Sequence, residues 1–67
     1  MDFQTAGFAP PLRVLVAAEN ALVRAGLAAL LGNQPGLDVV GQCGTGDELE
    51  PALDLYRPDV VICDLGY

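Results

Sequence analysis

The sequence predicts an α/β fold in which three parallel strands alternate with two helices. Short apolar runs rich in β-branched residues supply the strands, within 12–17, 37–43 and 58–65. Segments with helical patterning, 21–31 and 47–56, separate these runs, and every connection is short. Right-handed crossovers then give a parallel βαβαβ unit. Because polar residues interrupt the second run, it is expected at a sheet edge, and the predicted strand order is 2-1-3.

The first strand and the first helix have the clearest patterns. Residues 12–17 (LRVLVA) are almost continuously apolar, as in a strand buried within a sheet. Asn20 is a good N-cap for the Ala- and Leu-rich helix at 21–31. Arg24 is expected to turn toward water, and Gly26 would be explained by close approach to a strand. Four apolar residues at helical spacing are expected to face the sheet: Val23, Leu27, Leu30 and Leu31.

The second helix is predicted over residues 47–56 although it contains Pro51. With Asp47 as the N-cap, Glu50 falls at the third helical position and completes a capping box. Pro51 then falls at the fourth position, whose N–H has no partner within the helix. Arg57, which precedes a proline, is expected to end the helix.

The third strand is predicted to be buried on both faces, yet it ends in a carboxylate, Asp64. Ligands of open parallel sheets bind at the carboxyl ends of central strands, so Asp64 is either a cap for the next turn or a reactive group. The first strand is followed by Glu19. In the order 2-1-3 these two acids reach the same rim of the sheet, where they are suited to a hard divalent cation such as Mg²⁺.

The composition limits the classes of function. A chain of 67 residues forms one small domain at most. Nine acids against three arginines, with no Lys or His, give a net charge of −6, which disfavours direct nucleic acid binding. Cys43 and Cys63 lack a metal-ligand spacing and are expected to be buried in a reducing compartment. There is no membrane-length apolar run and no secretory signal, so the prediction is a cytoplasmic protein with no membrane partner.

Five short pieces share a spacing with a known family: 13–16, 22–27, 38–41, 46–49 and, most clearly, 57–65 (RPDVVICDL). Together they resemble the N-terminal half of a response-regulator receiver domain of bacterial two-component signalling. The LVR-x-GL and VVG pieces are most similar to receivers attached to a helix-turn-helix domain of the LuxR/NarL type. The resemblance implies a partial flavodoxin-like (CheY-like) fold over residues 12–67, truncated after the third strand. Residues 1–11 are then expected to be a disordered leader.

The resemblance also implies roles for individual residues. Asp64 falls on the phosphorylated aspartate, which makes the chain a phosphoprotein in signal transduction and not an enzyme. Ala18 and Glu19 fall on the acid pair that holds Mg²⁺, and the backbone carbonyl of Gly66 falls on a third metal contact. The implied partner is a sensor histidine kinase. DNA would be bound only through an effector domain that these residues do not contain, in a full-length transcriptional regulator.

Departures from the family leave the function open. Ala18 replaces the first acid and the Met-Pro turn after the acceptor is missing, so Mg²⁺ binding and phosphorylation are expected to be weak or absent. The family's switch Thr/Ser and its Lys lie on later strands. The chain is therefore expected either to belong to a longer protein or to be completed by a second chain, as in a dimer.

Two alternatives come from other classes of protein. The first is a pseudo-receiver, an interaction or dimerisation module without phosphotransfer, in which Asp64 is only a cap; the apolar fraction of 52% favours it. The second is the nucleotide-binding half of an enzyme, suggested by the Gly44-Thr45-Gly46 turn. That turn lacks the G-x-G-x-x-G spacing after the first strand, and the chain has no Walker lysine, so this alternative is much weaker.

Overall fold

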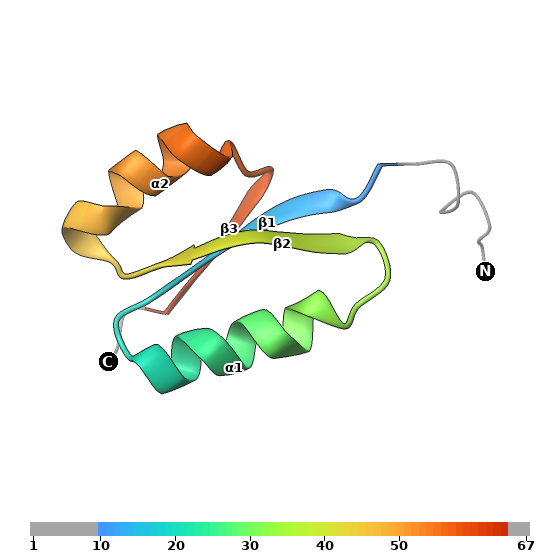
Figure 1. The fold of residues 1–67 in the computed structure, drawn as a ribbon, viewed down its shortest axis with the longest axis horizontal. Helices are drawn as coiled ribbons and strands as arrows, with labels where there is room; N and C mark the ends of the chain where they lie inside the picture. The colour runs from blue at the N-terminus through green and yellow to red at the C-terminus, as the bar shows by residue number, and fades with distance from the viewer. Residues whose placement is uncertain (1–9, 65–67) are drawn as a thin grey trace.

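The structure is a computed structural model that describes residues 10–64. Its three strands are parallel and lie in the order β2-β1-β3, with the two helices on opposite faces of the sheet (Figure 1). The predicted α/β class, the strand order 2-1-3 and the partial CheY-like topology are confirmed. The leader expected at 1–11 falls almost entirely outside the described residues. The elements are β1 (Leu12–Ala18), α1 (Ala21–Gly32), β2 (Leu37–Cys43), the 3₁₀ turn η2 (Gly46–Glu48), α2 (Leu49–Tyr56) and β3 (Val60–Asp64).

The central strand β1 forms the core. Its last five residues are at most 2% exposed, and alternate side chains point to opposite faces of the sheet. Leu15 and Ala17 pack with Cys43 of β2 and Ala52 of α2. Val14, Val16 and Ala18 therefore face the side covered by α1. A strand hydrogen-bonded on both edges and covered on both faces is the most rigid platform this fold offers.

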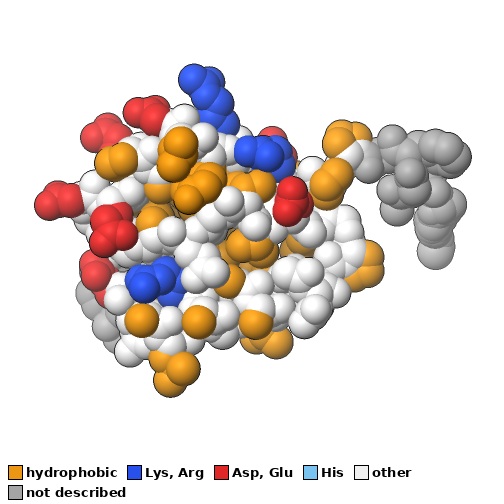
Figure 2. All heavy atoms as spheres, in the orientation of Figure 1, with side chains coloured by type: hydrophobic (Ala, Val, Ile, Leu, Met, Phe, Trp, Pro, Cys, Tyr) orange, Lys and Arg blue, Asp and Glu red, His pale blue; other side chains and the backbone are white. Residues whose placement is uncertain are grey.

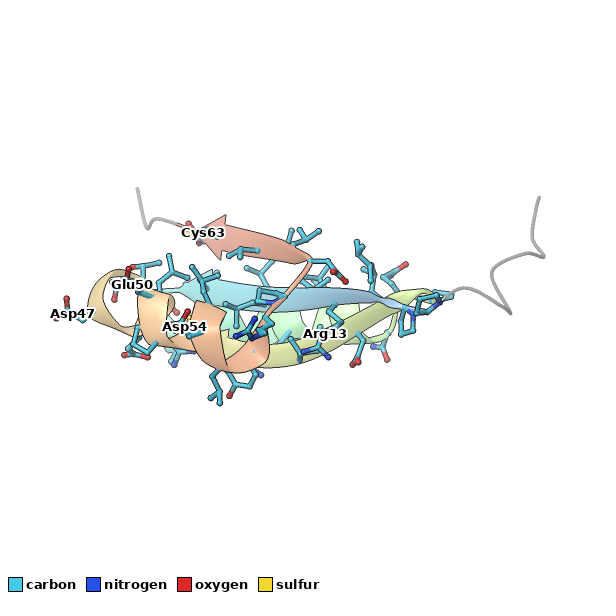
Figure 3. The ribbon with its side chains drawn as sticks, turned by 90° about the horizontal axis from the view of Figure 1, so that it is seen from above. Arg13, Asp47, Glu50, Asp54 and Cys63 are labelled. Atoms are coloured by element: carbon cyan, nitrogen blue, oxygen red, sulfur yellow. The ribbon has the colours of Figure 1, made fainter. Side chains whose placement is uncertain are left out.

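The prediction that the third strand is buried on both faces is wrong. Ile62 is 36% exposed, and Cys63 is exposed as well. The reason is that both helices pack mainly on β1 and β2, so that β3 lies beside α2 rather than beneath it (Figure 3). The expected burial of the cysteines is therefore confirmed for Cys43, which is 7% exposed, and wrong for Cys63.

Helix α1 is rotated from its predicted orientation. Asn20 caps it as expected, accepting hydrogen bonds from the backbone N–H groups of Leu22 (2.8 Å) and Val23 (3.0 Å). Arg24, however, is partly buried, whereas Leu30 is 68% exposed. A Cβ on Gly26 would meet no atom within 4 Å, so the expected close approach of a strand is also wrong. The half-buried residues of this helix are Arg24, Leu27, Ala28 and Leu31.

The start of α2 also differs from the prediction. Asp47 lies within the 3₁₀ turn and is not the N-cap; α2 begins at Leu49, and Glu48 occupies the capping position without a side-chain cap bond. The Glu48 carboxylate instead accepts a hydrogen bond from the Gly44 N–H at 2.9 Å. Pro51 becomes the third residue of α2, a position where its missing N–H still costs nothing.

The amino-terminal end of the sheet is tied by Arg13 and Asp59. Their backbones share one hydrogen bond, from Asp59 N–H to Arg13 O at 2.8 Å, and the Asp59 carboxylate accepts a second from Arg13 N–H at 2.8 Å. The Arg13 guanidinium also donates to the carbonyl of Tyr56, near the end of α2 (Figure 3). Arg57 ends that helix with a left-handed φ of 48°. These bonds fix where β3 begins beside β1.

Candidate acidic site at the carboxyl ends of the strands

The three strands end together at one rim of the sheet, here called the carboxyl rim: Ala18, Glu19, Gly44, Thr45 and Asp64. In the register of β1 and β3, Ala18 pairs with Asp64. On the other side of β1, Ala17 pairs with Cys43, the last residue of β2. Glu19 follows β1 directly, so the structure places the two predicted acids on neighbouring strand ends. Gly66, the third predicted contact, lies outside the described residues.

Asp64 is the last residue of β3 and is partly buried. Paired residues of neighbouring parallel strands project from the same face of the sheet, so Asp64 shares the face of Ala18, the one covered by α1. Its position at the end of a strand next to the central one matches the place where ligands of open parallel sheets bind. Asp64 therefore lies at the carboxyl end of an edge strand, next to the end of the central strand β1.

Glu19 is exposed and accepts a hydrogen bond from the hydroxyl of Thr45. This bond joins the end of β1 to the loop that follows β2, across 26 residues of sequence. The sequence pattern did not single out Thr45 as a partner of Glu19. The contact could have been inferred only from the parallel pairing of β1 and β2, which brings the carboxyl ends of these two strands together.

Ala18 is fully buried and contributes no side-chain oxygen to the rim. Its backbone carbonyl accepts a hydrogen bond from the Arg24 guanidinium at 2.9 Å. The expectation that Arg24 points to water is therefore wrong. Side chains in a helix lean toward its N-terminus, so an arginine in the first turns of α1 reaches back to the end of β1. That geometry is the signal by which the contact was predictable.

The loop after β2 places further charge near the rim. Burial raises the pKa of the Cys43 thiol above its ordinary value, the Glu48 carboxylate and Cys63 raise it further, and the Arg24 guanidinium opposes them. The thiol is therefore held in its neutral form, which is a poor metal ligand and a poor nucleophile. More acids follow in the chain: Asp47 lies in η2, and Glu50 and Asp54 lie on α2 (Figure 3). Figure 2 shows acidic side chains gathered on this side of the molecule.

The donor set fits a resident Mg²⁺ poorly. Mg²⁺ prefers near-octahedral oxygen coordination, with one or two carboxylates supported by further oxygens. Within residues 10–64 no three Asp, Glu, Cys or His side chains group together in a way that would hold a metal ion. Glu19 is engaged by Thr45, and the Ala18 carbonyl is engaged by a guanidinium.

Comparison with known proteins identifies relatives of this chain. The chain is 42% identical over 57 residues to the transcriptional regulatory protein PdtaR of Mycobacterium tuberculosis, a match covering 85% of this chain and 27% of that protein. It is 46% identical over 55 residues to the response regulator GacA of Pseudomonas viridiflava, covering 81% of this chain and 25% of GacA. This chain is a homologue of response regulators. The DNA-binding transcriptional activator DevR/DosR of M. tuberculosis is 39% identical over 54 residues, 81% of this chain and 25% of that protein.

The resemblance of the sequence to a response-regulator receiver is therefore confirmed. The chain spans about a quarter of the length of these relatives. Neither a family model nor a solved structure matches the chain. In the part of the chain that the structure describes, no helix is both long and apolar enough to cross a membrane.

Proposed function

We propose that this chain is the phosphoacceptor part of a two-component response regulator, in which Asp64 accepts a phosphoryl group from a sensor histidine kinase. The observation that carries the proposal is the place of Asp64, at the end of β3 and in register with the end of β1. Ligands of open parallel sheets bind at this end of the strands, which supports the proposal. The protein would be cytoplasmic, as its kinase partner requires.

In the proposed reaction, an oxygen of the Asp64 carboxylate attacks the phosphorus of a phosphohistidine. The new O–P bond forms as the N–P bond breaks, and the imidazole that leaves takes up a proton. A divalent cation at the rim would offset charge on the transferring oxygens. Because Ala18 provides no carboxylate there, we propose that this cation binds weakly and that phosphorylation of Asp64 is slow.

The regulatory output is proposed from the relatives. PdtaR and DevR/DosR are named as transcriptional proteins, and we propose that the intact protein likewise controls transcription. The chain itself, with a net charge of −6, would be repelled by phosphates, so contact with DNA falls to a separate effector domain. We assign no catalytic activity of its own to this part.

Labelling with a small phosphodonor such as acetyl phosphate tests the proposal. The Asp64→Asn variant is expected to lose the acid-stable, base-labile label that an aspartyl phosphate gives. Asp59→Asn is the matched control, since it removes an acid from the other end of β3 while keeping an oxygen that accepts the Arg13 N–H bond. Equal labelling of both variants would show that Asp64 is not the acceptor.

The alternative of a pseudo-receiver that associates without chemistry is favoured by one observation. Apolar side chains remain on the surface, including Leu22, which is 82% exposed, and Ile62 on β3. A pseudo-receiver would self-associate, or bind its partner, equally well with Asn in place of Asp64. Sedimentation velocity of the wild-type chain and of Asp64→Asn, with and without phosphodonor, separates the two functions.

A further inference from the structure

The carboxyl rim contains a positive charge that the chain itself supplies. Arg24 lies in the first turns of α1, where its N–H donates to the Asn20 carbonyl at 2.9 Å. The Asn20 side chain caps the same helix, so the start of α1 is fixed relative to the end of β1. From this base the guanidinium reaches the Ala18 carbonyl at 2.9 Å and is partly buried there.

The Arg24 guanidinium lies at the end of β1, next to the strand ends that carry the two proposed site acids. Ala18 pairs with Asp64 across the sheet and immediately precedes Glu19 in the chain. The other two arginines lie at the opposite end: Arg13 near the start of β1 and Arg57 at the end of α2. Since the sequence has no Lys or His, Arg24 is the basic side chain of this rim.

The Arg24 guanidinium also acts on its surroundings through charge. It lowers the pKa of the Cys43 thiol, against the effects of burial and of Glu48. Partly buried charges are screened less by water and salt than exposed ones. A divalent cation entering the rim would meet this positive charge, and it would find the Ala18 carbonyl already accepting a hydrogen bond.

We propose that Arg24 is a positioning residue that supplies the positive charge of the carboxyl rim in place of a divalent cation. It holds the end of β1 beside Asp64 and weakens the binding of Mg²⁺. This inference deepens the proposed function, because it concerns the same rim and assumes that Glu19 and Asp64 face a common ligand.

The test is a Mg²⁺ titration of the ¹⁵N-labelled chain, followed by the backbone amide shifts of Glu19 and Asp64. Arg24→Gln is expected to bind Mg²⁺ about three- to ten-fold more tightly than the wild type, as expected for removal of a nearby, partly screened like charge. Arg24→Lys keeps the charge and is expected to resemble the wild type. Arg57→Gln changes the net charge by the same amount at the far end of the sheet and is the matched control.

Equal Mg²⁺ affinities for Arg24→Gln and Arg57→Gln would overturn the proposal, because only net charge would then matter. If the Arg24→Gln variant loses its dispersed spectrum, it no longer folds. The test then follows the arginine side-chain Nε–H signals of the wild-type chain during the Mg²⁺ titration. The Arg24 Nε–H is expected to shift with the same midpoint as the Glu19 amide, and a signal that stays still while the rim amides move would overturn the proposal. Labelling of Asp64 is measured separately, so a failure of phosphorylation is distinguishable from a failure of the role of Arg24.

Discussion

Replacing Gly41 by Ala tests the packing that holds α2 on the sheet. Gly41 lies in β2 beneath the ring of Tyr56, the last residue of α2. An ideal Cβ at this position would lie 2.6 Å from Tyr56 Cε2 and 2.7 Å from Cζ. Carbon atoms in contact prefer separations of about 3.5–4.0 Å, so the overlap is about 1 Å. The ring must therefore leave its place against the core, or the helix must move.

The expected cost follows from this overlap. Adding one carbon to a packed core destabilises by about 1–3 kcal/mol. Ala restricts the unfolded chain more than Gly, which returns about 0.4–1 kcal/mol. A net loss of about 1–2 kcal/mol is expected, which is a large part of the stability of so small a domain. Gly26→Ala is the matched control because a Cβ there meets nothing within 4 Å, and it should stabilise α1 by about 0.5–1 kcal/mol.

Urea unfolding followed by circular dichroism gives the change in the free energy of unfolding for each variant. Gly41→Ala is expected to lower it and Gly26→Ala to raise it. A double-mutant cycle isolates the clash: the cost of Gly41→Ala is measured in the wild type and again in the Tyr56→Leu variant. Without the ring, Gly41→Ala should cost less than in the wild type, with a coupling of about 1 kcal/mol. The reasoning is refuted if Gly41→Ala is as stable as the wild type, or if its cost is the same without the Tyr56 ring.

Three further predictions concern other parts of the fold. Exposed Cys63 should react with a maleimide faster than buried Cys43, and equal rates measured by mass spectrometry would contradict the packing of α2. Asp59→Ala removes the acceptor of the Arg13 N–H and should lower the free energy of urea unfolding by about 1 kcal/mol, whereas an unchanged midpoint would argue against that bond. The folded chain holds the Cys43 proton more tightly than the unfolded chain, because its thiol pKa is raised. Stability should therefore fall as pH rises past the ordinary thiol pKa toward the raised one, and Cys43→Ala should flatten this slope.

Much of the fold was predictable from local pattern. The bounds predicted for the second strand, 37–43, are those of β2, and the Asn20 cap forms as expected. The order 2-1-3 followed from the polar residues of the second strand together with the handedness of crossovers, and it is confirmed. These features are set by residues close in sequence or by rules that hold for nearly all parallel sheets.

The features that were missed depend on contacts and turns that hydrophobic periodicity does not reveal. Arg24 turns inward because the carbonyl of Ala18 needs a donor, and a backbone acceptor leaves no mark on hydrophobic periodicity. Asp47 fails as a cap because a 3₁₀ turn precedes α2. Cys63 is exposed because the helices cover β1 and β2, which the pattern of its own strand does not reveal.

At the carboxyl rim, the sequence predicted which strand ends meet but not how their side chains are engaged. That the ends of β1 and β3 lie side by side follows from the predicted order of strands, whereas the register that pairs Ala18 with Asp64 does not. The bond from Thr45 to Glu19 does not follow either, because it depends on the path of the loop after β2. The assignment of Asp64 as phosphoacceptor and of Glu19 as a metal ligand stays a prediction.

Locating the phosphoryl group on the chain tests the role of Asp64 most directly. The protein is treated with phosphodonor and then with borohydride, which reduces an aspartyl phosphate to homoserine, and its peptides are sequenced by mass spectrometry. Homoserine at position 64, absent from the Asp64→Asn variant and from protein without phosphodonor, is the predicted result. Homoserine at position 59 in place of 64, or none at position 64 after treatment with the donor and with a kinase, would contradict it.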